Sequence, residues 1–435
     1  MIQRLNFLLA HWPEKPPLDL RILSKQQTPT AESTISKKQT LVYIFVLGFL
    51  LLVQTLVTDM FLPAYPNIAA FFEVPDAFVQ YSLSAVTLGA AIGFFFAGPL
   101  SDSLGRKRPV LFALGIFTIS SAALYVAPGI EAFVVLRFFQ GLAGAAIAVV
   151  TQAIIRDLFV GNAMLKMLAR VWLVSGVAPM VSPFISAQLL LVAPDWRIIP
   201  AALAILGVLI FFLASKALVE THHQDNRRAK GFDGVNRRFL AVFKDRVLVG
   251  LVLIGMVQTV GLFSYLNIIP FLYQDSLGLS PVEFSIAFSI TAFCWFMGIQ
   301  AGAKLGRMFR ATWVVFAALL LAVASGIGLF AIANQSPGIT TVIPIMALFM
   351  ISFGMTITPI QTIALQGHGS EAGTAASVLG VMNSLTAALA APLYPIIGSE
   401  TTGGLGLAIL FSHLAAIAIF FLVVRPKSVP ALIKD

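Results

Sequence analysis

The stretch Gly98-Pro99-Leu100-Ser101-Asp102-Ser103-Leu104-Gly105-Arg106-Lys107-Arg108 joins two long apolar segments of the chain. A shorter version follows another apolar segment in the second half, where the sequence reads Gly302-Ala303-Lys304-Leu305-Gly306-Arg307. The Gly-Arg pair recurs at a spacing of 201 residues, and Ala303 stands where the first copy has Asp102. Because similar turns follow apolar segments in both parts, the chain is expected to consist of two related halves.

The segments around these turns are too apolar for a water-soluble protein. Of the 435 residues, 58% are hydrophobic and only 11% are charged, whereas soluble domains carry about 25% charged residues. Apolar runs of roughly 18 residues or more predict membrane-spanning helices. Twelve such runs are found, at 41–64, 78–100, 109–127, 132–155, 167–192, 197–217, 248–272, 282–303, 311–333, 339–365, 372–397 and 403–424. The sequence therefore predicts an all-α membrane protein with twelve transmembrane helices in two six-helix pseudo-repeat bundles.

The longest loop divides these spans six and six. Residues 41–217 form the expected N-terminal bundle and residues 248–424 the C-terminal bundle, with 218–247 as a charged linker. Residues 1–40 are polar and proline-rich, which is typical of a disordered tail, and 425–435 form a second tail.

Lysine and arginine gather on one side of the predicted membrane. Only Arg137 and Arg197, of 28 basic residues, lie away from the tails and the even-numbered turns. Basic loops stay in the cytoplasm. We therefore expect the chain to cross an inner (plasma) membrane many times, with both termini and the linker on its cytoplasmic side. The net charge of +9 is then an orientation signal and a contact surface for anionic membrane lipid, and nucleic acid is not an expected partner.

At this point the sequence resembles the major facilitator superfamily, over about residues 41–425. The opening stretch is similar to the family motif between spans two and three at Gly98, Leu100, Asp102, Gly105, Arg106 and Lys107. The run Arg137-Phe138-Phe139-Gln140-Gly141 resembles a motif of drug:proton antiporters, and Asp59-Met60-Phe61-Leu62-Pro63 resembles a signature of the Bcr/CflA-like branch. In span five, Pro179 and Pro183 lie where the antiporter motif would fall, but Ser186 and Ala187 replace its glycine pair.

The resemblance implies a gate on the cytoplasmic side. In the family, the residue at Asp102 faces span eleven and the one at Arg106 pairs with an acid at the inner end of span four, here Asp157. The expected gate residues are therefore Gly98, Asp102, Gly105, Arg106 and Asp157. The alternative is that the basic residues of this loop only set orientation.

Two charged residues fall clearly inside the spans, Asp59 and Arg137. A charge in lipid needs a partner or a water path. Each lies about five residues from the outer end of its span, hence roughly 8 Å deep at 1.5 Å per residue. Equal depth and opposite charge make them candidates for a pair. Aspartate can titrate whereas arginine stays protonated, so proton coupling by Asp59 and Arg137 is one hypothesis, and a static ion pair between spans one and four is the other.

Polar residues inside the spans are candidates for a substrate cavity. In span four, Gln140 and Gly144 share one helical stripe with Arg137, which indicates either a cavity wall or a packing seam. In the second half, amides and an aromatic residue suit an uncharged or weakly charged lipophilic substrate. The predicted cavity residues are Gln140, Gly144, Gln258, Tyr265, Gln361 and Asn383.

The resemblance implies a secondary active transporter that exports drug-like molecules or metabolites in exchange for protons by alternating access, working as a monomer. An uptake symporter or facilitator with the same fold is the alternative. A membrane enzyme or receptor would need a catalytic constellation or a large extramembrane domain, and the sequence contains neither. No cofactor is expected, because no phosphate-binding loop is present, and the single cysteine, Cys294, and five histidines give little for a metal site.

Overall fold

The computed structural model of the chain describes residues 37–159, 161–221, 245–335, 337–366, 372–390 and 401–429. All regular elements in these ranges are helical. Most of the predicted N-terminal tail and most of the central linker lie outside the described residues. At their edges, helices begin inside both predicted segments, at Lys37 and Arg246.

Helices are found at all twelve predicted spans, with bounds that differ from the prediction by up to eight residues where they are described. The first half holds α3 (Lys37–Asp59) with η2 (Leu62–Ala64) and α4 (Tyr65–Phe72), then α5 (Asp76–Leu104), α6 (Lys107–Tyr125), α7 (Ile130–Leu158), α8 (Gly161–Val192) and α9 (Ile198–Ala217). The second half holds α11 (Arg246–Phe271) with η4 (Leu272–Ser276), α12 (Pro281–Met308), α13 (Ala311–Ile332) with η5 (Ala333–Gln335), α14 (Ile339–Gln366), α15 (Ala372–Ala390), and α17 (Thr402–Ile419) with η8 (Phe420–Val424) and η9 (Pro426–Ser428). In the described residues, ten helices are long and apolar enough to cross a membrane, and two shorter apolar segments, Gly176–Val192 and Val378–Ala390, belong to α8 and α15.

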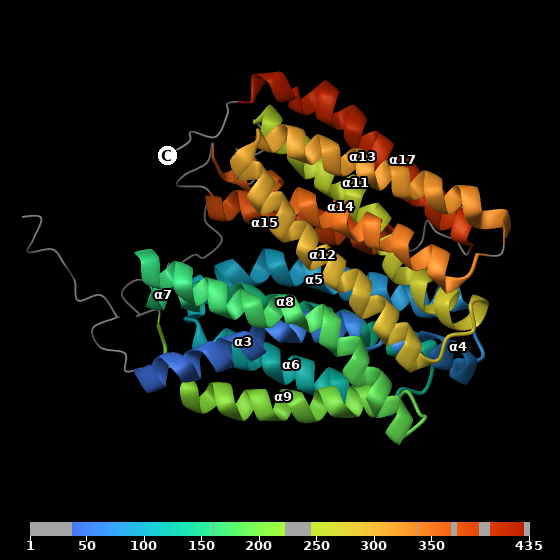
Figure 1. Cartoon of the computed structure of the whole chain (residues 1–435). Helices are drawn as coiled ribbons and strands as arrows, with labels where there is room; N and C mark the ends of the chain where they lie inside the picture. The colour runs from blue at the N-terminus through green and yellow to red at the C-terminus, as the bar shows by residue number, and fades with distance from the viewer. Residues whose placement is uncertain are drawn as a thin grey trace, which may run out of the picture.

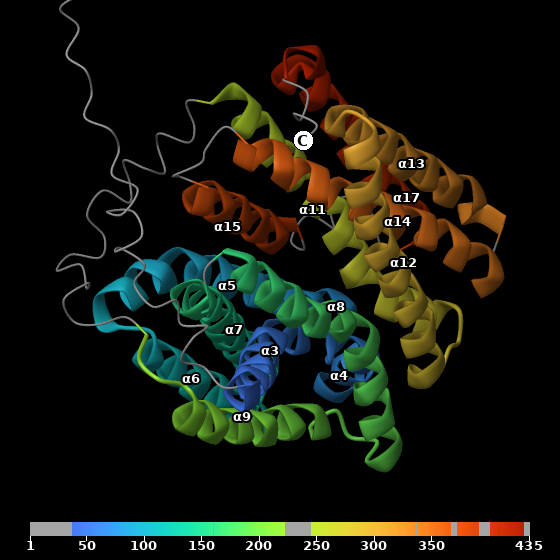
Figure 2. The same ribbon diagram turned by 60° about the vertical axis from the view of Figure 1, so that its left-hand side comes forward.

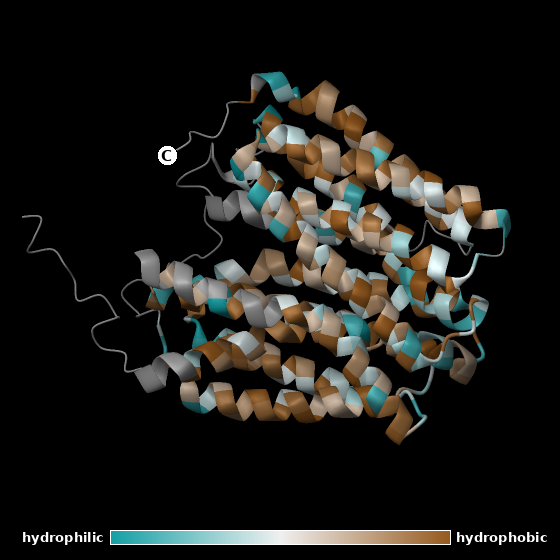
Figure 3. Cartoon of the chain, viewed as in Figure 1, coloured by the Kyte–Doolittle hydropathy of each residue, from teal (hydrophilic) through white to brown (hydrophobic). Residues whose placement is uncertain are grey.

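The helices run back and forth across the molecule in two groups that lie side by side (Figures 1 and 2). Helices α3 to α9 form one group and α11 to α17 the other, and the groups meet where α5 contacts α15 and α8 contacts α12. Hydrophobic residues line the helices along their length (Figure 3). We call the end that carries Arg106 and Arg310 the basic end; it lies on the left in Figure 1, where the linker leaves α9.

Glycines hold the tightest helix pair of each half together. A Cβ added to Gly89 or Gly141 would overlap a backbone carbonyl of the facing helix in the α5–α7 pair. The same holds for Gly298 and Gly354 in the α12–α14 pair. Only glycine lets two backbones approach this closely. The seam recurs between the second and fourth spans of each half, which is physical support for the pseudo-repeat.

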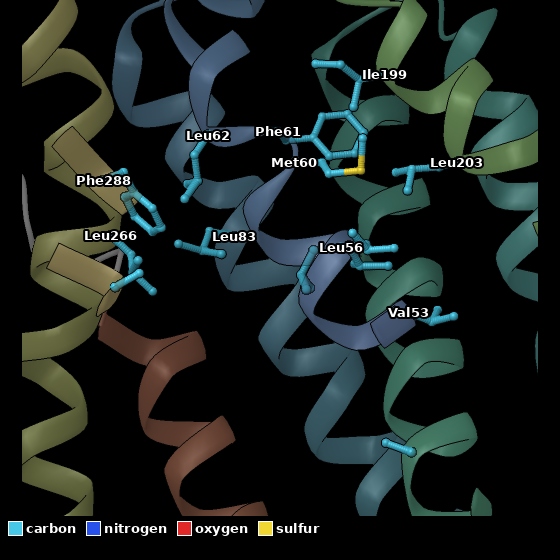
Figure 4. Close-up of a cluster of buried hydrophobic side chains, with 14 of the residues drawn as sticks. Val53, Leu56, Met60, Phe61, Leu62, Leu83, Ile199, Leu203, Leu266 and Phe288 are labelled. Atoms are coloured by element: carbon cyan, nitrogen blue, oxygen red, sulfur yellow. The ribbon is translucent and has the colours of Figure 1, made fainter. Parts of the chain in front are cut away.

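The first span is broken at a proline that lies where the two groups meet. Pro63 has no N–H to continue the helical ladder, and α3 gives way after Asp59 to the short 3₁₀ turn η2. The buried side chains around this break pack in two directions, as Figure 4 shows. Met60 and Phe61 lie near side chains of α9, whereas Leu62 lies toward the second half. In Figure 4 the neighbours are Ile199 and Leu203 on one side and Leu83, Leu266 and Phe288 on the other. The break thus sits at the junction of the halves.

Candidate functional site

The break in span one leaves backbone carbonyls that buried side chains satisfy. The last α-helical bond of α3 runs from the Met60 amide to the Leu56 carbonyl at 3.2 Å. Beyond it, Nη1 of Arg137 donates to the Val57 carbonyl at 2.6 Å, and Oγ of Ser186 donates to the Met60 carbonyl at 2.5 Å. Carbonyls at a helix end need such partners where water is excluded. Side chains of α7 and α8 therefore hold the break in place.

Arg137 is hydrogen-bonded inside the first half through Nη1, whereas its Nε and Nη2 have no hydrogen-bond partner among the described residues. The residue is fully buried, and its Nη1 also donates to Oε1 of Gln140 at 2.9 Å. Gln140 in turn donates to Oγ of Ser121 on α6 at 2.8 Å. The guanidinium carbon lies 4.1 Å from the ring centroid of Phe61, a cation–π contact. These contacts offset part of the cost of burying a guanidinium that stays protonated.

Asp59 does not pair with Arg137, and the pairing considered from the sequence is wrong. Asp59 is only 7% exposed, yet among the described residues it has no ion pair and no hydrogen bond. The two residues do lie at similar heights along their spans. The reason is angular: Arg137 contacts Val57 and Phe61, which lie on one face of the span, and a residue two positions away projects about 200° around the helix.

The carboxylate faces the second half instead. Asp59 lies close enough to the Tyr265 phenol, on α11, for an electrostatic interaction between them. The Tyr265 hydroxyl is 2.6 Å from Oγ1 of Thr291 on α12. Its ring stacks on Phe288 with centroids 6.1 Å apart, and Phe349 lies on another side at 6.3 Å. Asp59 is thus a buried carboxylate without a partner among the described residues, within electrostatic reach of Tyr265 and its aromatic neighbours.

Several buried polar atoms of both halves have no hydrogen-bond partner within the described ranges. Among them are Oε1 of Gln54 in α3 and, in α11, η4, α12 and α15 of the second half, Nε2 of Gln258, Oδ1 of Asn267, the Tyr273 hydroxyl, Nε1 of Trp295 and Oδ1 of Asn383. Because an unsatisfied buried polar atom costs free energy, such atoms are expected to meet substrate or water at some stage of a working cycle.

The predicted cavity residues separate into two groups. Gln140 and Gly144 do not line a space between the halves: Gln140 is bonded inside the first half, and Gly144 lets Gln54 of α3 approach α7. For these two the packing-seam alternative is correct, because the stripe they share faces neighbouring helices of their own half. Gln258 and Tyr265 are buried in α11, and Asn383 of α15 lies against Gly255 of α11. Gln361 of α14 is exposed.

At the basic end, the opening stretch forms a charged cluster around Arg106. Its Nη1 donates to Oδ1 of Asp102 at 2.6 Å and to Oγ of Ser101 at 2.7 Å, and its Nε donates to Oδ2 of Asp157 at 2.8 Å. Burial opposes the charge of the guanidinium, but the hydrogen bonds and charges of Asp157 and Asp102 outweigh it and raise the pKa of Arg106. The Arg106–Asp157 contact therefore exists as the resemblance implied.

Other expectations for this loop are modified. Asp102 bonds to Arg106 through Oδ1, and no hydrogen bond or ion pair between Asp102 and α15 is found among the described side chains, although α5 and α15 pack together. Gly105 is required by its backbone, with φ +89°. An added Cβ at Gly98 would meet only Val149, at 3.9 Å, so no close approach demands glycine there.

Glu220 was not predicted from the sequence, and the Gly-Arg recurrence matched Arg106 to a different arginine of the second half than the structure does. Glu220, just after α9, accepts from the amides of Arg106 at 2.7 Å and Lys107 at 3.3 Å, and so caps α6. Arg106 is the N-cap of the third span in the first half, and Arg310 is the N-cap of the corresponding α13. Arg307, matched from the Gly-Arg recurrence, lies inside α12. The sequence did contain a signal for each residue: Glu220 is an acid directly after span six, and Arg310 is an arginine directly before span nine.

Two six-helix halves that meet around a buried carboxylate define a class of protein: the secondary transporters, whose substrate and coupling ion bind between the repeats. The chain belongs to the Major Facilitator Superfamily, whose family model matches residues 47–391.

Named relatives support this assignment. The chain is 33% identical over 368 residues to an uncharacterized major facilitator transporter, YdgK, of Bacillus subtilis, covering 84% of this chain and 90% of that protein. It is 27% identical to a bicyclomycin resistance protein homolog of Haemophilus influenzae, covering 83% and 94%. It is 28% identical to the multidrug resistance protein MdtL of Shewanella oneidensis, covering 76% and 83%.

Solved structures share the fold at low identity. A D-xylose–proton symporter matches with a TM-score of 0.69 at 16% identity, covering 91% of this chain and 100% of that chain. A bacterial homolog of the human lysosomal transporter Spinster matches with a TM-score of 0.73 at 15% identity, covering 90% and 98%.

Proposed function

We propose that this protein exports small lipophilic molecules in exchange for protons by alternating access. The observation that carries the proposal is Asp59: a buried carboxylate, without a partner in the described residues, at the junction of the halves. A charged carboxylate is costly in an apolar junction. Closing the halves around Asp59 therefore favours the protonated form, and opening a wet path favours release of the proton.

In this proposal Arg137 acts as a positioning residue for the break and keeps its charge throughout. Its hydrogen bond to the Val57 carbonyl and that of Ser186 to the Met60 carbonyl fix the backbone on both sides of Asp59. The break can then transmit a change at Asp59 to α7 and α8. Proton coupling thus rests on Asp59 directly and on Arg137 through the backbone.

The proposed substrates follow from the relatives' names and from the side chains around Tyr265. Bicyclomycin is the first compound to test, because a relative is named for resistance to it. The aromatic rings around Tyr265 suit an apolar body, and the unsatisfied amides of Gln258 and Asn383 suit its polar groups. We include Gln361 as an exposed contact on α14.

The proposal keeps the predicted orientation and organisation. The basic end faces the cytoplasm of an inner membrane, the linker 218–247 and both tails lie inside, and bundles 41–217 and 248–424 move against each other. Gly98, Asp102, Gly105, Arg106 and Asp157 form the cytoplasmic gate, in which Arg106 exchanges partners as the halves move. The working unit is a monomer in contact with membrane lipid.

Uptake coupled to protons is the second candidate, since a symporter shares the fold. Accumulation of labelled bicyclomycin in cells separates the two directions. Export predicts more compound inside when an uncoupler collapses the proton gradient, and uptake predicts less.

The decisive experiment is proton release on adding bicyclomycin to purified protein in weakly buffered detergent. The wild-type protein is expected to release protons. Asp59→Asn should still bind the compound, because an amide can hydrogen-bond where the neutral acid did, but should release none. If Asp59→Asn releases the wild-type number of protons, the carrier is another group and the proposal fails.

A further inference from the structure

A groove opens at the basic end of the second half, on the outer side of α12, α13 and α14. It has a volume of about 570 Å³ and is lined by Leu305, Phe309, Arg310, Trp313, Val314, Ala317 and Met355. Phe309 is 60% exposed and Trp313 is 41% exposed. Tryptophan is enriched at the level of lipid headgroups. The groove is therefore mostly apolar, with exposed aromatic side chains and one arginine in its lining.

The corresponding place in the first half already contains an anion. There the Glu220 carboxylate accepts from the Arg106 and Lys107 amides at the start of α6. Helix α13 starts in the same way, with Arg310 as its N-cap, but its first turn holds no acidic residue. Among the described residues no carboxylate reaches it, and the buried hydroxyl of Thr312 at the second helical position has no partner. A helix start with free amides and a positive dipole favours an anion.

Within the described residues, the positive charges around the groove are not paired with carboxylates. Arg310 donates to the Val429 carbonyl at 2.8 Å and Arg307 to the Ala303 carbonyl at 3.3 Å, both uncharged acceptors. Lys304 adds a further exposed positive charge on α12. Arg106, by contrast, is paired with two carboxylates. The first half supplies its own anions, and the second half leaves a place for one.

We propose that this groove binds an anionic phospholipid of the leaflet next to the basic end. The phosphate lies at the start of α13 against Arg310, and one acyl chain runs along Val314, Ala317 and Met355. Basic pockets between helices at this level suit anionic headgroups, and the apolar lining suits a chain rather than a free anion.

The test is native mass spectrometry of the full chain in detergent, titrated with phosphatidylglycerol or phosphatidylcholine. One phosphatidylglycerol should bind before the rest, and more tightly than phosphatidylcholine. Arg310→Gln should weaken the first binding event about fivefold, the effect of one basic residue near an anionic lipid. Arg310 is exposed, so the variant is expected to fold. Lys216→Gln removes one exposed charge at the same end, on α9 outside the groove, and should change nothing.

Two further measurements use the wild-type protein. Dihexanoyl phosphatidylglycerol keeps the headgroup but has short chains, and should bind at least tenfold more weakly than the long-chain lipid. Inorganic phosphate should not displace the long-chain lipid at equal concentration. The proposal is overturned if Arg310→Gln and Lys216→Gln weaken binding equally, which means diffuse surface attraction. It is also overturned if short-chain lipid or phosphate binds as well as the long-chain lipid, which means an anion site only.

Discussion

The two halves of this transporter share a helical frame but differ in how their inner polar groups are held. In the first half Arg137 and Arg106 are bound by carbonyls, amides and carboxylates of the same half, although Nε and Nη2 of Arg137 have no partner among the described residues. In the second half buried amides such as those of Gln258 and Asn383 lack partners among the described residues. Hydrogen bonds and ion pairs such as those of Arg137 and Arg106 fix geometry, whereas a polar group without a partner can bind a ligand. In the function proposed above, the first half accordingly holds the coupling residues, and the second half receives substrate and lipid. Asp59 is the exception, a residue of the first half that faces the second.

The largest effect is expected from removing Arg137. In Arg137→Ala the Val57 carbonyl and the Gln140 amide lose their donor in a buried site, which should cost about 3 to 5 kcal/mol of stability. Arg137→Lys keeps the charge but not the planar fork, and should lose less. Thermal unfolding of purified protein in detergent measures both.

Arg197 is the matched control for Arg137. Its guanidinium carbon lies 4.1 Å from the Phe71 ring centroid, the same distance as in the Arg137–Phe61 contact. It is partly exposed, and its ion pair to Asp195 is 3.7 Å long. Arg197→Ala should therefore cost less than about 1 kcal/mol. Equal losses in the two alanine variants would mean that the buried hydrogen bonds of Arg137 contribute no more to stability than the exposed contacts of Arg197.

The next effect concerns the Arg106 cluster. Asp157→Asn removes a charged hydrogen bond from a side chain that is 22% exposed, and should cost about 2 kcal/mol. Asp102→Asn acts on a side chain that is 38% exposed and should cost less than about 1 kcal/mol. Transport of bicyclomycin into inverted vesicles should slow in both. Unchanged transport in both would leave the loop as an orientation signal only.

Ser186 tests whether the break is tied to α8. Ser186→Ala leaves the Met60 carbonyl without its donor and should cost about 1 kcal/mol, together with a slower transport cycle. Ser182→Ala is the matched control, because Ser182 is also buried in α8 and its hydroxyl has no partner in the described chain. That variant should be neutral in unfolding and in transport. A larger loss in Ser182→Ala than in Ser186→Ala would refute the tie.

The spans were predictable, but the partners across them were not. Long apolar runs give the height of each residue in the membrane, so the helices and the depths of Asp59 and Arg137 follow from sequence. Hydropathy does not give the rotation of each helix about its axis. For that reason Asp59 and Arg137 looked like a pair, and Gln140 looked like a cavity residue. Ser186 and Glu220 act on backbone groups 126 and 114 residues away, and no local pattern reveals such contacts. The replaced glycine at Ser186 was the one local sign.

The smallest change in stability, and the sharpest test of the comparison, comes from Gln258→Met. The Gln258 amide nitrogen is buried without a partner in the described residues, so an apolar side chain of similar shape should leave stability within about 0.5 kcal/mol or raise it. If the amide serves substrate, the same variant should bind bicyclomycin about tenfold more weakly, the loss of one good hydrogen bond. Unfolding curves and equilibrium binding on one preparation report the two quantities separately. The control is Gln335, whose amide is exposed after α13, at the end of the molecule opposite the basic end. Gln335→Met should change neither the stability nor the affinity for bicyclomycin. A Gln258→Met protein that loses stability but keeps its affinity would show that the amide is structural, and the buried amide of the second half would then serve stability as the Arg137 hydrogen bonds do in the first.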